Sequence, residues 1–165
     1  MFFHSILKPR TIICYAESMI QFEYSEDKKF FEMLLVTKEK PSIEDFKTLF
    51  DFRPPSIKRA EFNQCRKKIR AQLIKKHGKK CMLAMEFCNL DNGIAIDHLI
   101  PLSTNKLNKE LRNLMPDKHK KVRSQSFGSN HMDNLIIACN KCNSHKKYRL
   151  LDRKKILQIF TEKGK

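Results

Sequence analysis

The residues best suited to chemistry stand in two short stretches of the chain. Asp97 and His98 form the first stretch, and Cys139, Cys142 and Asn143 form the second. The Asp97 carboxylate and the Asn143 side-chain carbonyl are the oxygen ligands that a hard cation such as Mg²⁺ or Mn²⁺ prefers. The His98 imidazole is mostly neutral near neutral pH, as a general base must be. A divalent ion beside a general base is suited to hydrolysing a phosphodiester.

The cysteines indicate a second, structural metal site. Zinc takes four soft ligands in a tetrahedron, and Cys139-x2-Cys142 supplies half of such a site. Cys81 and Cys88 are the remaining pair in this region, and six residues separate them. Four closed thiolates leave no open position for chemistry. The alternatives are four buried thiols without a metal, or a histidine as a substitute ligand, namely His77, His119 or His131.

The order of these motifs resembles the HNH nuclease family over about residues 64–150. The set consists of Asp-His-x-x-Pro from Asp97, Asn-Leu from Asn134, and a final Cys-x2-Cys-Asn-x-x-Lys. The resemblance implies a ββα-metal fold in which Asp97 and Asn143 bind the catalytic ion. It implies that His98 is the general base. It also implies that Asn134 braces the loop and orients that base without binding metal.

The resemblance further implies Mg²⁺ or Mn²⁺ as the catalytic ion and Zn²⁺ as a structural ion on the four cysteines. Zinc-bearing members usually have Cys-x2-Cys where this chain has Cys-x6-Cys, and they often have His at the position of Asn143. The function so predicted is a DNA endonuclease of the restriction or phage-defence kind, with RNA as an alternative substrate. A different class also accounts for the charge and the cysteines: a zinc-stabilised nucleic-acid-binding module without catalysis.

The predicted fold class is therefore α+β, with a ββα-metal core, a zinc site of four cysteines and flanking helices. Pro54-Pro55 marks a boundary between a small α/β extension over residues 1–53 and a nuclease domain over 54–165. The core of that domain covers about residues 79–149. Hydrophobic spacing and turn residues predict a helix over 56–77 that ends at Gly78, strands over 94–100 and 134–138, and a closing helix over 149–161.

Residues 1–50 contain no motif typical of catalysis or metal binding. Their β-branched and aromatic residues predict a strand or hairpin over 11–24. Ser25 is expected to cap a helix, and Ser42 and Asp45 have capping-box spacing at the start of another. This segment either packs on the core or docks a partner, which would be a second copy of the chain or another protein.

Positive charge is concentrated after residue 50. Residues 1–50 hold seven basic and eight acidic residues, a net charge of −1, whereas residues 51–165 hold 27 and ten, a net charge of +17. This imbalance favours a polyanionic partner, although charge runs also form ordinary solvated faces. The predicted nucleic-acid contacts are Arg66, Lys67 and Arg70 on the helix over 56–77, Lys120, Lys121 and Arg123 in the long connection over 102–133, and Lys146 and Lys147 near the last motif.

No stretch is apolar enough to span a bilayer, and the start lacks the basic region of a signal peptide. We therefore expect a soluble protein of the cytoplasm. The resemblance to the HNH family implies a bacterial or phage setting. Six cysteines in a reducing compartment favour metal ligands or free thiols over disulfides. Cys14 and Cys65 are expected to be core residues.

Overall fold

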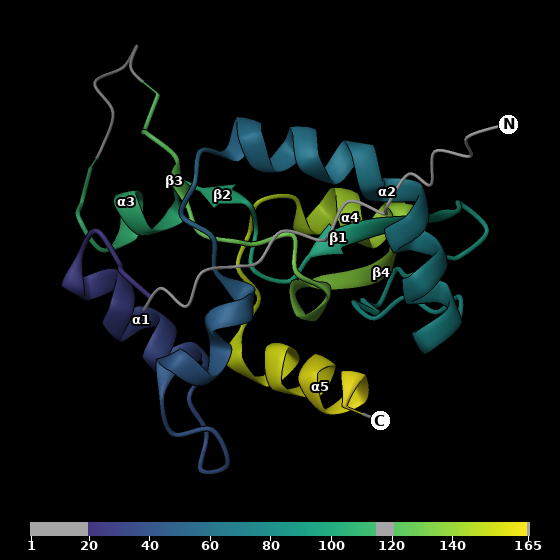
Figure 1. Cartoon of the computed structure of the whole chain (residues 1–165), viewed down its shortest axis with the longest axis horizontal. Coiled ribbons are helices and arrows are strands. Elements are labelled where there is room, and N and C mark those ends of the chain that lie inside the picture. Colours follow the sequence, from purple (N-terminus) through teal and green to yellow (C-terminus); the bar gives the residue numbers. More distant parts are fainter. Residues whose placement is uncertain (1–19, 115–120, 165) are drawn as a thin grey trace, which may run out of the picture.

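The computed structural model describes residues 20–114 and 121–164, and these residues form an α+β structure (Figure 1). At its centre lies an antiparallel pair of strands, β1 (Ile94–His98) and β4 (Leu135–Cys139). Helix α4 (Asn140–Lys146) follows β4 directly and contacts both strands. Gly93, with φ +82°, makes the turn before β1. The mixed fold class and the two strands are confirmed.

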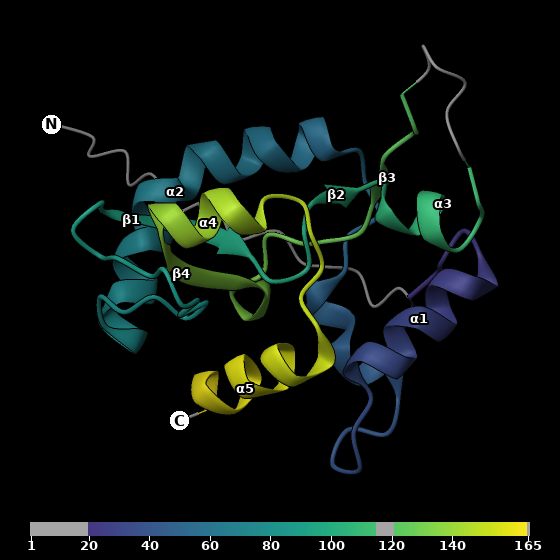
Figure 2. The ribbon, with the colours of Figure 1, turned by 180° about the vertical axis from the view of Figure 1, so that it is seen from behind.

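The two faces of this strand pair meet different parts of the structure. Ile96 of β1 and Ile137 of β4 are paired in register and pack with Leu73 of helix α2 (Pro55–His77). Ile136 belongs to the larger core on the opposite face, because neighbouring residues of a strand point to opposite sides. The two views show α2 and α4 on either side of the strand pair (Figures 1 and 2).

Helix α2 ends where the sequence predicts. Its last residue is followed by Gly78, which has φ +73° and donates its backbone N–H to the carbonyl of Ile74. Lys58 and Leu73 are buried in α2 and Ile69 is partly buried, whereas most other residues of the helix are exposed. The assignment of Cys65 to the core is wrong. Its thiol is exposed because β4 and its neighbours cover only part of the apolar stripe of α2.

The N-terminal layer consists of α1 (Ser25–Leu35) and a 3₁₀ helix, η1 (Ile43–Leu49). Ser42 and Asp45 form the expected capping box at the start of η1. The expected capping by Ser25 is wrong: Ser25 is already the first helical residue, and the position before it holds a tyrosine that makes no capping bond.

The predicted strand or hairpin over 11–24 lies mostly outside the described residues, as does Cys14. Residues 20–24, which are described, form no strand.

This layer shares one hydrophobic core with the strand pair. Phe31 of α1 packs against Phe127 at 5.1 Å between ring centroids, and Phe50 pairs with Gly128 in an isolated β-bridge. The same cluster contains Ile136 of β4 and Ile159 of α5 (Arg153–Lys163). The described part of the first 53 residues therefore packs directly onto the rest of the chain.

The long connection between β1 and β4 is folded where it is described. It contains β2 (Ser103–Thr104), α3 (Lys106–Glu110), β3 (Gln125–Ser126) and a 3₁₀ turn, η2 (Met132–Asn134), and β2 pairs with β3. The predicted closing helix is also present, but it begins at residue 153 instead of 149. The Asp152 side chain accepts a hydrogen bond from the Lys155 N–H and caps it there.

A buried ionic network ties α1 to this connection. The Asp27 carboxylate accepts one hydrogen bond from Arg112 Nη2 and one from Gln125 Nε2, each 2.8 Å long. Arg112 also donates to Asn108 Oδ1 and lies over the Tyr24 ring, 3.6 Å from its centroid. Arg112 is thus a packing residue and is not a free contact for phosphate.

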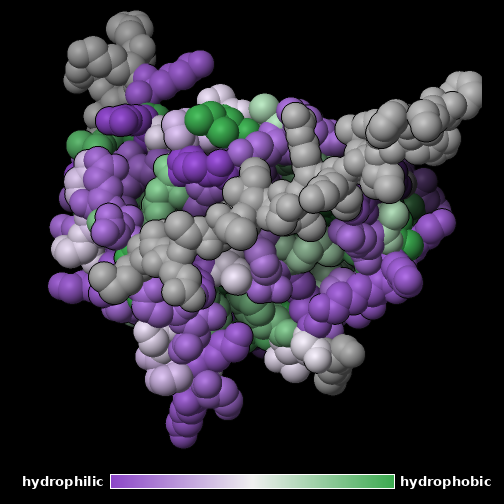
Figure 3. Space-filling model, viewed as in Figure 1, coloured by the Kyte–Doolittle hydropathy of each residue, from purple (hydrophilic) through white to green (hydrophobic). Residues whose placement is uncertain are grey.

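Hydrophilic side chains cover most of the described surface visible in Figure 3, with smaller hydrophobic areas between them. Among residues 20–114 and 121–164, no helix combines the length and the apolar character that a bilayer crossing needs.

We expect Gly128→Ala to lower the free energy of unfolding by about 2 kcal/mol or more, because overpacking against backbone strains the core. A β-carbon at this position would clash with the carbonyl oxygen of Ile100 and lie 2.7 Å from that of Pro101. Gly164→Ala is the matched control, since its nearest atoms would be 3.6 Å away. Urea unfolding measures both variants, and equal stabilities would contradict this account.

Candidate metal and active site

Four cysteine side chains converge at one end of the strand pair. The sulfur atoms of Cys81, Cys88, Cys139 and Cys142 all lie within 4.8 Å of one another, and Cys88 Sγ is 3.7 Å from Cys139 Sγ. Cys139 ends β4 and Cys142 lies in the first turn of α4, whereas the other two come from the loop between α2 and β1. The predicted grouping is confirmed, and these four residues could hold a metal ion such as zinc.

Backbone N–H groups point at two of these sulfurs. The Ala84 N–H donates to Cys81 Sγ at 3.4 Å, and the Cys142 N–H donates to Cys139 Sγ at 3.3 Å. Ala84 has φ +41°, so the backbone turns sharply after Cys81. Such bonds favour thiolate over thiol, because the charged acceptor forms the stronger hydrogen bond. The donor set therefore fits a tetrahedral zinc ion despite the long Cys-x6-Cys spacing.

The surroundings of Cys139 and Cys88 shift their pKa values in opposite directions. Burial opposes ionisation of Cys139, yet the N–H groups of Cys142 and Asn89 outweigh it and lower the pKa of Cys139 to about 6. Burial and the neighbouring thiols raise the pKa of Cys88 to about 12. The negative charge of one thiolate thus disfavours ionisation of the neighbouring thiols. A divalent cation bound among the four sulfurs would favour the ionised form instead.

The histidines considered as substitutes are not part of the cysteine group. Neither His77 nor His131 belongs to it among the described residues, and His119 lies outside them. His145 is exposed, and its ring packs edge-on against Phe87 at 4.9 Å between centroids.

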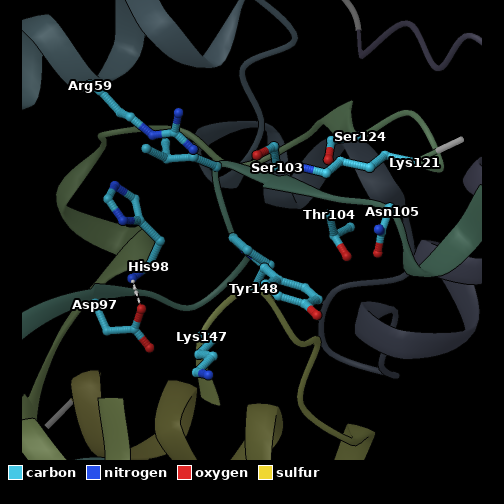
Figure 4. Close-up of a pocket in the computed structure, with 12 residues that line it drawn as sticks. Arg59, Asp97, His98, Ser103, Thr104, Asn105, Lys121, Ser124, Lys147 and Tyr148 are labelled. Carbon is cyan, nitrogen blue, oxygen red and sulfur yellow. Dashed lines mark hydrogen bonds between the residues drawn. The ribbon is translucent and has the colours of Figure 1, made fainter. Parts of the chain in front are cut away.

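Asp97 and His98 lie at the other end of β1 and point to opposite sides of it (Figure 4). The Asp97 side chain is on the side of α4 and is buried. Its Oδ1 accepts the His98 N–H at 2.8 Å, and its Oδ2 lies 3.0 Å from Lys146 Nζ. That ion pair lacks hydrogen-bond geometry, so Oδ2 has no hydrogen-bond partner among the described residues. Burial raises the pKa of Asp97, and the Lys146 charge opposes this rise.

His98 is held on the side of α2. Its Nε2 lies 3.0 Å from Asn130 Oδ1, and its ring packs on Phe62 of α2 at 5.2 Å between centroids. Burial lowers the pKa of His98 from 6.5 to about 4. The imidazole is therefore neutral at physiological pH, as the role of general base requires.

Asn134 braces the loops around this site. Its amide nitrogen donates to the carbonyls of Ile100 and Ser129, at 3.0 and 2.8 Å, and its carbonyl accepts the Ile100 N–H at 2.7 Å. The predicted bracing is thus present. Asn134 makes no hydrogen bond to the His98 ring among the described residues, and the side chain that faces the ring nitrogen is that of Asn130.

Asn130 was missed by sequence reasoning. An isolated asparagine in a loop has no sequence signal that would distinguish it.

Lys146 is not a surface residue. Its side chain is fully buried, and its ammonium donates to the His98 carbonyl at 2.7 Å in addition to facing Asp97. The predicted phosphate contact of Lys146 does not fit this position, because the charge is already enclosed. Asn143, one turn earlier in α4, is half-buried and does not line the pocket that Asp97 and His98 line.

That pocket has a volume of about 720 Å³ and a basic rim. Arg59, Lys121 and Lys147 line it, and all three are exposed (Figure 4). Lys121 and Lys147 were predicted as nucleic-acid contacts. Arg59 was not, because nothing in the sequence shows which turn of the helix faces the pocket. The remaining lining residues are Asp97, His98, Pro101, Leu102, Ser103, Thr104, Asn105, Ser124 and Tyr148.

The other predicted nucleic-acid contacts lie away from this pocket. Arg66, Lys67 and Arg70 are exposed on α2, and none of them lines it. Arg123 is exposed and lines a neighbouring pocket that shares Ser124 with the first. Lys120 lies outside the described residues.

Comparison of the chain with protein-family models, curated proteins and solved structures finds no match.

We expect the purified protein to carry about one zinc ion per chain, measured by mass spectrometry, if the four cysteines form one tetrahedral site. Cys88→Ser should lose that ion and a large part of the folding free energy, because a structural zinc is bound only by the folded state. Cys65→Ser is the matched control, since Cys65 is an exposed free thiol. Full zinc content in the Cys88 variant would exclude Cys88 as a ligand.

The His98 ring should titrate near pH 4 in the folded protein, which NMR of the imidazole can measure. The folded pKa is below the unfolded value of 6.5, so the unfolded chain takes up the proton first. Stability should therefore fall by about 1.4 kcal/mol per pH unit as the pH drops from 6.5 toward 4. A midpoint near 6.5 would show that the ring is solvated, and would contradict the described burial.

Proposed function

We propose that the chain is a metal-dependent endonuclease that hydrolyses phosphodiester bonds of DNA through an HNH-type site. One observation carries this proposal. Asp97 and His98 leave the end of one strand on opposite sides, and both line a single pocket with a basic rim. In-line displacement at phosphorus needs its nucleophile and its leaving group on opposite sides. A phosphate between the two side chains would meet that need.

Each residue has a role that its surroundings support. The neutral His98 imidazole takes a proton from the attacking water. Arg59, Lys121 and Lys147 place positive charge beside the substrate phosphates, which requires no fixed geometry. The net charge of +16 acts in the same direction over a longer range.

A hard cation fits Asp97. Its Oδ2 is a buried carboxylate oxygen without a hydrogen-bond partner among the described residues, and Mg²⁺ or Mn²⁺ takes such oxygens while keeping several waters. When bound, such an ion supplies charge neutralisation at phosphorus and at the leaving oxygen. Asn143 is proposed as the second ligand from the resemblance to the family. The four cysteines would hold zinc for structural purposes, since a closed thiolate site has no open position.

The finer parts of the proposal rest mainly on the motifs. These parts are the assignment of β1, β4 and α4 to a ββα-metal core, the choice of DNA over RNA, and a restriction or phage-defence role in a bacterial or phage setting. The antiparallel strand pair followed directly by a helix supports the first of them. A partner or a second copy bound through residues 1–50 also remains a proposal, and it would use surface that the shared core leaves free.

A second candidate is a nucleic-acid-binding module without catalysis. The ion pair between Lys146 and Asp97 favours it, because the buried carboxylate already has a counter-charge without a metal ion. This candidate keeps the zinc, the basic rim and the charge, and it assigns no chemistry to His98.

Incubation with supercoiled plasmid separates the two candidates. We expect nicked or linear DNA with Mg²⁺ or Mn²⁺ and none with EDTA. We expect a loss of about a hundredfold or more in rate for His98→Ala, the contribution of a general base. His145→Ala is the matched control, because that histidine is exposed and lies against Phe87.

A wild-type protein that shifts DNA in a salt-sensitive manner but cuts neither DNA nor RNA would support the binding module. Equal cutting by wild type and His98→Ala would remove His98 from the role of base. Loss of cutting in His145→Ala as well would indicate damage to the fold, which circular dichroism would show.

A further inference from the structure

The side-chain amide of Asn130 has only one orientation that satisfies both of its neighbours. Asn130 Nδ2 lies 2.7 Å from the backbone carbonyl of Lys58, which can only accept a hydrogen bond. The amide nitrogen must therefore face Lys58, and the amide oxygen must face His98. Because that oxygen also can only accept, the His98 Nε2 at 3.0 Å must carry the proton.

The carbonyl of Lys58 is itself fixed in place. Lys58 lies in the first turn of α2 and is completely buried. Its ammonium donates to the carbonyls of Asp51 and Gly128, at 2.5 and 2.7 Å, and more weakly to that of Leu102 at 3.3 Å. Three separate segments thus hold this residue, so the acceptor that orients Asn130 has little freedom to move.

We propose that Asn130 is a positioning residue that fixes the tautomer of His98, with the proton on Nε2 and the lone pair on Nδ1. This inference rests on the proposed function for its catalytic meaning, since Nδ1 would then be the atom that accepts a proton from water. No described residue donates a hydrogen bond to Nδ1, and His98 lines the pocket. Phe62 limits the tilt of the ring from the side of α2.

The role is separate from that of Asn134. Asn134 bonds only to backbone groups and holds the loops together. Asn130 bonds to the ring itself and links it, through the Lys58 carbonyl, to the start of α2. A change at Asn134 should therefore affect stability, whereas a change at Asn130 should affect the chemistry of one imidazole.

Two variants of Asn130 test the proposal on the full chain. Asn130→Ala removes the acceptor for Nε2–H. Asn130→Asp keeps an acceptor oxygen beside His98 but loses the donor to the Lys58 carbonyl. Asn63→Ala is the control, because Asn63 is exposed on α2 and does not line the pocket. Nitrogen-15 NMR of the His98 ring, without added magnesium, reports which nitrogen carries the proton.

We expect a single tautomer with Nε2–H in the wild type and in Asn130→Asp, and a mixture of tautomers in Asn130→Ala. Plasmid cutting should fall about tenfold or more in kcat for Asn130→Ala with KM little changed. This is part of the hundredfold or more that a general base contributes. Asn130→Asp should recover most of that loss. If the aspartate variant were as impaired as the alanine variant, the donor to Lys58 would matter more than the acceptor, and the role would be structural.

An unchanged tautomer in Asn130→Ala would overturn the proposal whether or not the protein cuts DNA. A wild type that shows the Nε2–H tautomer and cuts neither DNA nor RNA would leave the positioning role in place and reject the nuclease. The two failures are therefore distinguishable. Thermal unfolding of each variant shows whether a lost signal comes from a lost fold.

Discussion

The buried ammonium of Lys58 is the contact on which the arrangement around the pocket depends. It joins the carbonyls of Asp51, Leu102 and Gly128, which belong to the end of the N-terminal layer and to both sides of the connection between β1 and β4. Burial lowers the pKa of Lys58 to about 8, and the nearby Asp51 charge opposes this shift. The three carbonyls offset the loss of hydration, because each replaces a water at a charged donor. Removing this side chain would leave three carbonyls from separate segments without their shared donor.

Different interactions hold the two ends of the strand pair in place. At one end four cysteines join the end of β4 and the start of α4 to the loop before β1. At the other end, backbone carbonyls and side-chain amides fix the loops around Asp97 and His98, with Asn134 between residues 100 and 129. Two strands alone do not form a stable sheet in water, so a short pair needs such supports. The pocket lies at the end that is held by hydrogen bonds.

Local patterns in the sequence predict the elements well. A short apolar run indicates β4, Gly78 ends α2, Ser42 and Asp45 begin η1, and two pairs of cysteines indicate a group of four sulfurs. The strand, the helix end and the capping box each depend on residues a few positions apart in the chain. The cysteine group depends on a residue type that commonly binds metal. The positions of Lys58, Lys146 and Asn130 depend on partners that lie up to 72 residues distant in the chain. A lysine in a basic sequence carries no sign that it will be buried, and so Lys146 is predicted as a surface contact and found in the interior.

Lys146 also defines the electrostatic state of Asp97. A carboxylate this deeply buried needs a positive charge nearby, and Lys146 supplies it at 3.0 Å. Yet the ammonium gives its hydrogen bond to the carbonyl of His98 at 2.7 Å and none to Asp97 Oδ2. The attraction between the two groups is therefore mainly Coulombic, and Oδ2 has no well-aligned hydrogen-bond donor among the described residues. A cation that bound Oδ2 would not have to break a hydrogen bond of Lys146, but it would have to bear the repulsion of that ammonium. A substrate phosphate in the basic pocket would add negative charge and so offset the repulsion between the cation and the Lys146 ammonium. Binding of the metal ion would therefore be coupled to binding of the substrate.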